Sequence, residues 1–281
     1  MKIPQDLIQS FQQQSCAVFV GAGISRGAGL PSWRTLMDEL IDEARSVPGI
    51  GSQAIYDYKN LMKDRSKYLT LASLLRRDLG KRFDEYISKR FADNTLQPSE
   101  AHKALVRLPA RFFITTNYDN LIERAYSGLY KGNRYLNSLT FKQVGQLASC
   151  LHRKELFLLK AHGDARTEPE SVVLTERDYR ELVYSQQGYQ SFLQTVFTTN
   201  RMLFLGASLD DFDLRLLLGF LFTAYHGKTP IHYVLMHENE KTGVEANALF
   251  HDFNINVLTF KGTDLTKGVC NWLNSVMTKL A

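Results

Sequence analysis

Cysteine is scarce, and no two cysteines stand close together in the sequence. Cys16, Cys150 and Cys270 are the three cysteines of this 281-residue chain, and no C-x-x-C pair occurs. A disulfide framework needs paired cysteines and a structural zinc site needs closely spaced ones, so neither is indicated. We therefore predict a reducing, cytoplasmic setting and no bound metal.

The chain also lacks the long apolar segments of membrane and exported proteins. Its first residues, Met-Lys-Ile-Pro-Gln-Asp, do not contain the apolar core of a signal peptide. The most apolar run, Leu216 to Ala224, is much shorter than the ~20 residues that a membrane span requires. We predict a buried or subunit-facing helix at this run and no association with a membrane.

Basic residues outnumber acidic ones, but they form no concentrated patch. The formal net charge of +5 and the pI near 9.0 would suit an anionic partner, either a nucleic acid or a nucleotide. The densest basic cluster, Arg76, Arg77, Lys81 and Arg82, is interrupted by Asp78. A solvated helix face is the favoured interpretation of such a cluster. Direct binding of nucleic acid is therefore not expected.

Short apolar segments alternate with helical patterns along most of the chain. The predicted strands are residues 17–20, 112–114, 155–160, 201–205, 231–236 and 255–260. Helical patterns lie at residues 4–15, 177–196, 212–225, 245–252 and 267–280. Strands that alternate with helices imply a parallel, doubly wound sheet, so we predict a Rossmann-like α/β fold.

Residues 35–108 interrupt this alternation between the first and second predicted strands. Apolar residues recur there at helical spacing, and no strand pattern is convincing. We predict a helical insertion at 35–108. The core domain would then consist of residues 1–34 and 109–281.

The stretch from Phe112 to Asn120 ends an apolar strand in a polar set. Asn117 and Asp119 stand two residues apart, so in an extended backbone both side chains would leave the same face. Polar residues at the carboxyl end of a buried parallel strand are typical of a ligand crevice. An ordinary helix cap before Leu121 is the alternative interpretation.

A glycine-rich turn follows the first predicted strand. The run Gly21-Ala-Gly-Ile-Ser25 lies between that strand and a helical pattern, an arrangement in which backbone N–H groups hold a phosphate. The match to the dinucleotide fingerprint G-x-G-x-x-G is imperfect, because Arg26 stands at the third glycine position. An ordinary glycine-containing loop remains the alternative for this turn taken alone.

Four predicted strands end in small or polar residues. These sets are Gly21–Ser25, Thr116–Asp119, His162–Asp164 and Gly206–Ser208. Because ligands gather at the carboxyl ends of parallel strands, we expect the four sets to meet around one ligand. The other histidines show no metal-ligand spacing, and we interpret them as surface or packing residues: His102, His152, His226, His232, His237 and His251.

In their order along the chain, these four motifs resemble the NAD-binding motifs of the sirtuin family. The chain departs from deacetylating sirtuins by lacking four zinc-binding cysteines, and by reading Pro31-Ser-Trp-Arg34 where they have Pro-Asp-Phe-Arg. These departures, with Leu174-Thr175 and Asp178-Tyr179, look like the prokaryotic sirtuin-like branch associated with NAD hydrolysis in antiphage defence, including the Thoeris type.

The resemblance implies that the chain consumes NAD as a substrate and cleaves the nicotinamide–ribose bond. The implied catalytic residues are Asn117, His162 and Asp119. The implied NAD-binding residues are Gly21, Ala22, Gly23, Ser25, Trp33, Thr116, Asn117, Asp119, His162, Gly206 and Ser208. An NAD-dependent ADP-ribosyl transferase or deacylase, or a catalytically silent NAD or ADP-ribose sensor, remains the alternative.

Constant NAD hydrolysis would harm the host cell. We therefore expect restraint through a homo-oligomer or a regulatory partner protein, although no sensor module is recognisable in the sequence.

Overall fold

A sheet of seven parallel strands lies at the centre of the protein. The computed structural model describes residues 3–209, 212–262 and 264–281. The strands are β1 (Cys16–Val20), β2 (Phe113–Thr115), β3 (Asn137–Thr140), β4 (Phe157–Lys160), β5 (Arg201–Leu205), β6 (His232–His237) and β7 (Ile255–Phe260). Their order across the sheet is β3-β4-β2-β1-β5-β6-β7, and all neighbours pair in parallel. The predicted doubly wound, Rossmann-like α/β class is confirmed.

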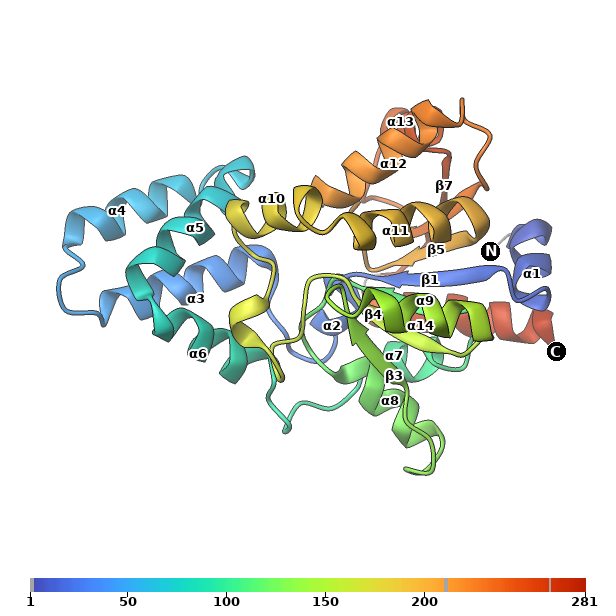
Figure 1. The fold of residues 1–281 in the computed structure, drawn as a ribbon, viewed down its shortest axis with the longest axis horizontal. Coiled ribbons are helices and arrows are strands. Elements are labelled where there is room, and N and C mark those ends of the chain that lie inside the picture. The colour runs from blue at the N-terminus through green and yellow to red at the C-terminus, as the bar shows by residue number, and fades with distance from the viewer. Residues whose placement is uncertain (1–2, 210–211, 263) are drawn as a thin grey trace.

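Helices connect the strands and cover both faces of the sheet (Figure 1). The α-helices are α1 (Gln5–Gln12), α2 (Ala22–Arg26), α3 (Trp33–Arg45), α4 (Ser52–Leu61), α5 (Tyr68–Leu79), α6 (Lys81–Phe91), α7 (Glu100–Leu105), α8 (Leu121–Leu129), α9 (Val144–Arg153), α10 (Glu176–Tyr184), α11 (Gln187–Thr199), α12 (Phe212–Ala224), α13 (Gly243–Phe253) and α14 (Leu265–Leu280). Two short 3₁₀ helices, η1 (Arg65–Lys67) and η2 (Pro169–Ser171), complete the connections.

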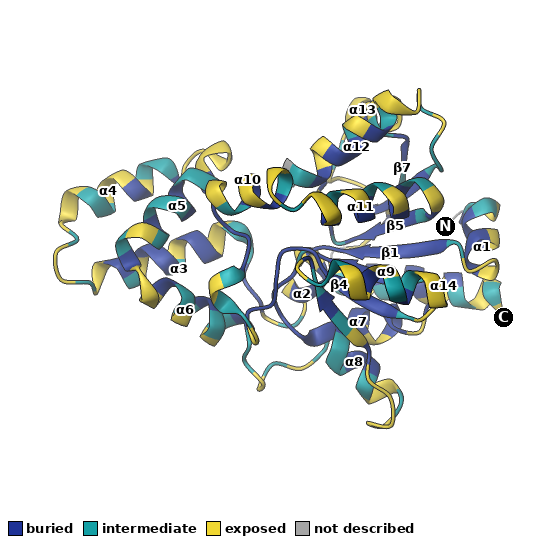
Figure 2. Cartoon of the chain, viewed as in Figure 1, coloured by how far each residue is buried: buried dark blue, intermediate teal, exposed yellow. Residues whose placement is uncertain are grey.

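The alternation of side chains along the strands divides the interior into two apolar layers. In β1, Ala17 and Phe19 face a core shared with α9 to α13, whereas Cys16, Val18 and Val20 face a core shared with α1, α7, α8 and α14. Both faces are covered, so the inner strands β4, β2, β1, β5 and β6 are buried along almost their whole length, as their dark colour in Figure 2 shows, whereas the edge strands β3 and β7 are only partly buried.

A third apolar core belongs to helices α3 to α6. These helices form a separate group at one end of the molecule, opposite the end where both chain termini lie (Figure 1). Their core also takes in Tyr118 and Leu121, which follow β2, and Leu174, which precedes α10. The helical group is therefore packed directly against the segments that leave the carboxyl ends of β2 and β4. Helix α7, by contrast, packs against α14 beside the sheet.

The structure differs from the predicted elements at several places, and helix α9 is one element that was not predicted. Strand β3 was not predicted, because this edge strand buries only Leu139 and otherwise reads as a polar segment. The predicted helix at 177–196 is two helices, since Gln186 adopts a non-helical backbone between α10 and α11. Helix α12 has a buried side that includes Leu217 and Leu221.

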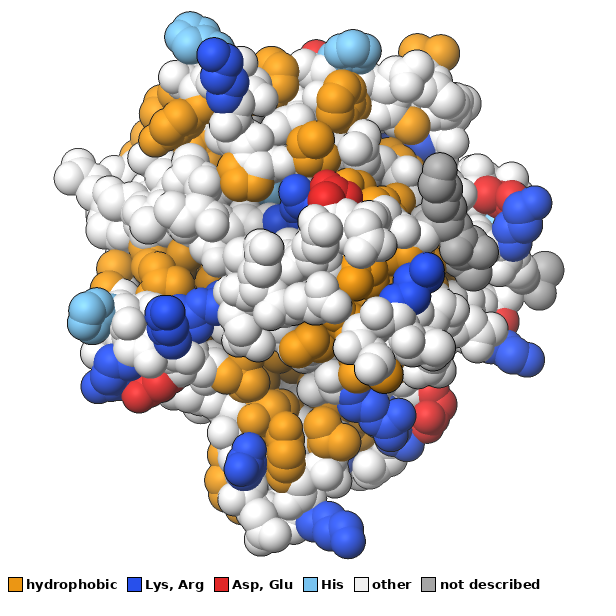
Figure 3. Space-filling model, turned by 90° about the vertical axis from the view of Figure 1, so that its right-hand side faces the viewer, with side chains coloured by type: hydrophobic (Ala, Val, Ile, Leu, Met, Phe, Trp, Pro, Cys, Tyr) orange, Lys and Arg blue, Asp and Glu red, His pale blue; other side chains and the backbone are white. Residues whose placement is uncertain are grey.

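The other side of α12 exposes Leu216 and Phe220. None of the described helices is long and apolar enough to cross a membrane. Figure 3 shows the face of the molecule at the termini, where Lys and Arg side chains are spread among other side chains and form no continuous patch.

The strand order reverses beside β1, and the glycine-rich turn lies at this point. From β1 the chain proceeds to β2 on one side, whereas β5, on the other side of β1, is followed by β6. Such a switch point is where ligands bind in parallel sheets. Here Gly21 N–H donates to Leu205 O at 2.9 Å and Gly23 N–H donates to Gly206 O at 2.9 Å. The turn after β1 is thus locked against the carboxyl end of β5.

This close approach predicts a large effect of adding one methyl group. A Cβ at Gly21 would lie 2.6 Å from Gly206 O and 2.7 Å from Ala207 Cα, so backbone atoms would have to move. We expect Gly21→Ala to lower the free energy of unfolding by about 1–3 kcal/mol, the scale of core overpacking. Denaturant unfolding measures the change.

The matched control for Gly21→Ala is Gly145→Ala. Gly145 lies in α9, and a Cβ there would meet no atom within 4 Å. This substitution should stabilise the protein by up to about 1 kcal/mol through helix propensity. Equal stability of the Gly21→Ala variant and the wild type would contradict the close approach of β1 and β5.

Candidate active site

A cavity of about 280 Å³ lies at the carboxyl ends of the central strands, between the sheet and the helical group. All the predicted ligand-binding residues line this cavity: Gly21, Ala22, Gly23, Ser25, Trp33, Thr116, Asn117, Asp119, His162, Gly206 and Ser208. The four strand ends therefore meet at one place. Trp33 begins α3, and its ring stacks on Tyr68 of α5, so the helical group contributes an aromatic wall.

Asn117 is held in a fixed orientation at the edge of the cavity. Its backbone N–H donates to Thr115 Oγ1 at 3.0 Å, and its side-chain Nδ2 donates to Gly21 O at 3.2 Å. Because a carbonyl oxygen can only accept, the bond to Gly21 defines which amide atom is Nδ2. The Oδ1 atom is buried and has no hydrogen-bond partner among the described residues. A buried amide oxygen of this kind is ready to accept a hydrogen bond from a ligand.

Ser25 joins Asn117 to Asp119. The Ser25 hydroxyl accepts from Asn117 Nδ2 at 3.0 Å and donates to Asp119 Oδ2 at 2.9 Å. The other carboxylate oxygen, Oδ1, accepts from the Leu121 N–H at 3.0 Å, at the start of α8. Asp119 thus accepts from the first N–H of α8, whose N-cap residue is Asn120, and also takes part in the site.

The extended backbone expected across Asn117 and Asp119 is wrong. Strand β2 ends at Thr115, and the following residues form a loop. The two side chains converge through the Ser25 hydroxyl, and not because they share one face of a strand. The sequence spacing therefore correctly predicted that Asn117 and Asp119 lie close together, but the reason given for it, a shared strand face, does not apply in this loop.

His102, which the sequence led us to interpret as a surface or packing residue, is a member of this network. It is fully buried, and its Nδ1 accepts from the Ser99 N–H at 3.2 Å in a capping box at the start of α7. The hydrogen is therefore on Nε2, which lies 3.5 Å from Ser25 Oγ. Burial lowers the pKa of His102 to about 4, although the nearby Asp119 acts in the opposite direction. The sequence Pro98-Ser99 before α7 is typical of a capped helix start, but nothing in it indicates the contact with Ser25.

His162 follows β4, is almost fully buried and also lines the cavity. Its Nε2 lies 3.0 Å from Asp213 Oδ2 in α12, and its ring meets Tyr179 edge-on at a centroid distance of 5.2 Å. A carboxylate can only accept, so Nε2 carries a hydrogen and the ring orientation is fixed. Asp213 was not predicted from the sequence, because it is far from His162 along the chain and belongs to no motif used above.

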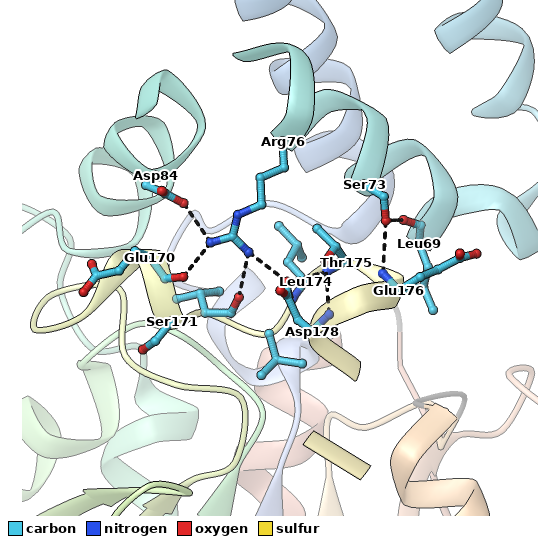
Figure 4. Close-up of polar contacts among 12 residues, drawn as sticks. Leu69, Ser73, Arg76, Asp84, Glu170, Ser171, Leu174, Thr175, Glu176 and Asp178 are labelled. Carbon is cyan, nitrogen blue, oxygen red and sulfur yellow. Dashed lines mark hydrogen bonds and ion pairs between the residues drawn. The ribbon is translucent and has the colours of Figure 1, made fainter. Parts of the chain in front are cut away.

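An arginine in the helical group fixes the segment that connects His162 to α10. Arg76 of α5 donates to Asp178 Oδ2 at 2.8 Å, to Asp84 Oδ1 at 2.9 Å and to the Glu170 carbonyl at 2.7 Å (Figure 4). Its side chain is only 20% exposed. The prediction of a solvated helix face is therefore wrong for Arg76, which attaches the helical group to the wall of the cavity that includes Leu174 and Tyr179.

A second cavity of about 390 Å³ continues from the first along the ends of β5 and β6. The two cavities share Gly23, Gly206 and Ala207, together with the exposed Arg26 and Glu240. Because Gly21 and Gly23 already donate their N–H groups to β5, Arg26 is the clearest group at the turn for an anionic ligand. In the sequence, Arg26 occupies the third glycine position of the dinucleotide fingerprint and makes the match to it imperfect.

The described part of the chain holds no group of three or more His, Cys, Asp or Glu residues arranged to bind a metal ion.

The depressed pKa of His102 predicts an acid-sensitive fold. Between the ordinary value of 6.5 and the folded value of about 4, the unfolded chain binds a proton at His102 and the folded chain does not. Stability is therefore complete above pH 6.5 and falls as the pH decreases, by about 2 kcal/mol at pH 5. The His102→Gln variant should lose this part of the pH dependence.

Unfolding by denaturant at pH 7.5 and pH 5 measures this difference in wild type and variant. The pKa of His232 is also lowered by burial, so His232 contributes equally to the pH dependence of stability in wild type and variant. The control is His152→Gln at an exposed position of α9. Identical pH dependence in wild type and His102→Gln would contradict the assigned state of His102.

A family model described as a SIR2-like domain matches residues 111–258. The chain is 28% identical to the "NAD(+) hydrolase ThsA" of Bacillus cereus (strain MSX-D12) over 246 residues, which are 88% of this chain and 48% of that protein. It is 24% identical to a protein of the same name from Acinetobacter baumannii (strain 532279) over 256 residues, 90% of this chain and 48% of that protein.

A third relative is the "Defense-associated sirtuin 2" of Bacillus subtilis. It is 26% identical over 219 residues, which are 77% of this chain and 20% of that protein. The chain thus spans about half the length, or less, of these relatives. The family model covers just over half of the chain, and its match includes the motifs of Asn117, His162 and Gly206. Together with the parallel sheet and its cavity, this match shows that the chain belongs to the SIR2-like domain family.

Proposed function

We propose that the protein hydrolyses NAD at the nicotinamide–ribose bond and releases nicotinamide with ADP-ribose or its cyclic form. The observation that carries the proposal is the meeting of Asn117, His162 and the glycine-rich turn around one cavity at the switch point of the sheet. The names of the relatives, NAD(+) hydrolase and defense-associated sirtuin, support a role as an NAD-depleting effector in antiphage defence.

The chemistry requires little acid catalysis. Nicotinamide carries a positive charge while it is bound in NAD, so it leaves as a neutral molecule without being protonated. The transition state resembles an oxocarbenium ion, and the protein must hold the ribose, stabilise the developing positive charge and direct a water molecule. Asn117 Oδ1, which is buried without a partner among the described residues, suits a ribose hydroxyl or the attacking water.

Asp119 and His162 have different roles in this proposal. Asp119 acts through Ser25, which holds the Asn117 amide with Nδ2 away from the ligand and Oδ1 available to it. His162 is the general base or the acceptor of a ribose hydroxyl, because a neutral imidazole nitrogen can take up a proton or accept a hydrogen bond. Asp213 orients the His162 ring and favours its protonated form when the ring takes up a proton.

The dinucleotide would extend across both cavities. The nicotinamide ribose occupies the cavity lined by Asn117, His162 and Trp33, and the adenosine half occupies the cavity at the ends of β5 and β6. Arg26 lies where the two cavities join and would bind the diphosphate. Glu240 lines both cavities, and its carboxylate could accept hydrogen bonds from ribose hydroxyls.

The finer features of this function are also proposals. We propose a cytoplasmic enzyme that uses no metal, binds no nucleic acid directly and is restrained in a homo-oligomer or by a regulatory partner. The exposed apolar side of α12, with Leu216 and Phe220, supports a protein contact on the helix that carries Asp213.

Nicotinamide release tests the activity. Purified protein incubated with NAD should release nicotinamide without an added acceptor, and Asn117→Ala should lower turnover by roughly 100-fold or more, the scale for loss of a positioned hydrogen-bonding group. His162→Ala should behave similarly, and the double variant should lose little more than either single one.

Asn247→Ala, at an exposed position of α13 that lines neither cavity, is the comparison variant and should retain the turnover of the wild type. Modification of an added acceptor in place of free ADP-ribose would favour the transferase alternative. NAD binding without release would favour the sensor. Near-normal turnover of a folded Asn117→Ala variant would refute the catalytic assignment.

Asp213→Asn tests the orientation of His162. The substitution keeps the size of the side chain but removes the negative charge of the group that accepts from His162 Nε2. His162 therefore becomes a weaker base. We expect turnover to fall by about 10-fold or more and the acid limb of its pH profile to move to lower pH. Asp252→Asn, at an exposed position of α13, is the control. An unchanged pH profile would show that Asp213 does not act through His162.

A further inference from the structure

Lys160, the last residue of β4, is buried between the Asn117 loop and the His162 loop. Its side chain is 1% exposed. A buried ammonium group is costly unless charged or polar partners surround it, so the identity of its partners is informative. No motif used in the sequence analysis included this lysine, and its side chain lines neither of the two cavities.

The partners of Lys160 come from both loops. The Nζ atom donates to the carbonyl oxygens of Asp119 at 2.7 Å and Tyr118 at 3.2 Å, in the loop that carries Asn117. It also donates to Asp164 Oδ2 at 2.8 Å, two residues after His162. Glu123 Oε1 in the first turn of α8 lies 3.5 Å away. One ammonium group therefore bridges the two segments that hold the proposed catalytic side chains.

Further contacts make this bridge rigid. Asp164 Oδ1 accepts from the Arg166 N–H at 2.8 Å, so both carboxylate oxygens of Asp164 are used. The Ala165 N–H donates to Tyr118 O at 3.2 Å, which joins the loops a second time. Burial disfavours the charged form of Lys160 most strongly, but Glu123 and Asp164 outweigh it, and the pKa of Lys160 is raised. The lysine therefore remains a cation at neutral pH.

We propose that Lys160 is a positioning residue that fixes the Asn117 loop relative to the His162 loop, and so sets the separation of the amide and the imidazole across the bound ribose. The proposal rests on the proposed NAD hydrolysis for its catalytic consequence. Its structural part, the locking of two loops by one cation, is independent of the reaction. Small displacements of catalytic groups cost large factors in rate, so loss of the lock should reduce turnover.

The variant Lys160→Met alone would leave Asp164 buried without its cation, and it could fail to fold for that reason. The double variant Lys160→Met/Asp164→Asn removes the cation together with its nearer carboxylate. Glu123, whose pKa is already raised by burial, can then become neutral by taking up a proton. The amide oxygen introduced by Asp164→Asn can still accept from the Arg166 N–H. Lys142→Met is the control, because Lys142 pairs with Glu168 near the same segment but is 46% exposed.

Amide hydrogen exchange tests the lock without reference to NAD. In the double variant, exchange of segments 117–121 and 163–167 should increase by about 10-fold or more, whereas β1 and β5 should exchange as in wild type. The Lys142→Met control should show no increase. Unchanged exchange of both segments in the double variant would overturn the proposal, whether or not the wild type cleaves NAD.

Steady-state kinetics test the catalytic consequence. We expect kcat of the double variant to fall by about 10- to 100-fold, with KM for NAD changed by less than about 3-fold, because the glycine turn and Trp33 are untouched. In a His162→Ala background the same double variant should cost much less, since the positioned partner is already absent. Equal fold losses in both backgrounds would overturn the positioning role.

A wild-type protein that releases no nicotinamide would refute the proposed function, and the exchange measurement would still decide the role of Lys160.

Discussion

The close backbone contact between the turn after β1 and the end of β5 is the constraint on which the site depends. Gly21 and Gly23 lie against Gly206 at distances that exclude any side chain, and their N–H groups bind the β5 end. This contact lies at the switch point of the sheet, and it positions Ser25 within hydrogen-bond distance of Asn117 in the loop that follows β2. The cavity exists because two backbones approach here without side chains between them.

Around this contact, a continuous polar network fixes the functional groups. Ser25 connects Asn117, Asp119 and His102, and thereby joins the β1 turn, the loop after β2 and the start of α7. Lys160 joins the same loop to the segment that carries His162. In a buried setting such networks hold their members firmly, because every broken bond leaves a desolvated polar group. Among the described residues, the Asn117 Oδ1 atom is a buried acceptor without a hydrogen-bond partner, and a ligand in the cavity can use it.

The helical group and α12 complete the site from outside the sheet. Arg76 attaches α5 to the segment between His162 and α10, and Trp33 supplies an aromatic wall. Asp213 reaches His162 from α12, a helix whose outer side exposes Leu216 and Phe220. The proposed general base is therefore oriented by a helix that is itself open to contact with another protein. This arrangement connects the proposed regulation by assembly to a specific hydrogen bond in the site.

The sequence by itself determined the parallel α/β class, because short apolar segments with the length of buried strands alternate with helical patterns. It also determined which strand ends form the site, because these segments end in recognisable glycine, amide and imidazole motifs. It also determined that Gly21, Asn117, His162 and Gly206 belong together, since parallel strands bring their carboxyl ends to one edge. Only the tertiary structure decided the roles of His102, Asp213, Lys160 and Arg76. Each of these side chains contacts residues that are distant in the sequence, and some of the contacted groups are backbone carbonyls. Contacts of this kind leave no pattern in the sequence. The edge strand β3 escaped prediction for a related reason, because half-exposed polar strands lack the apolar pattern that identifies buried ones.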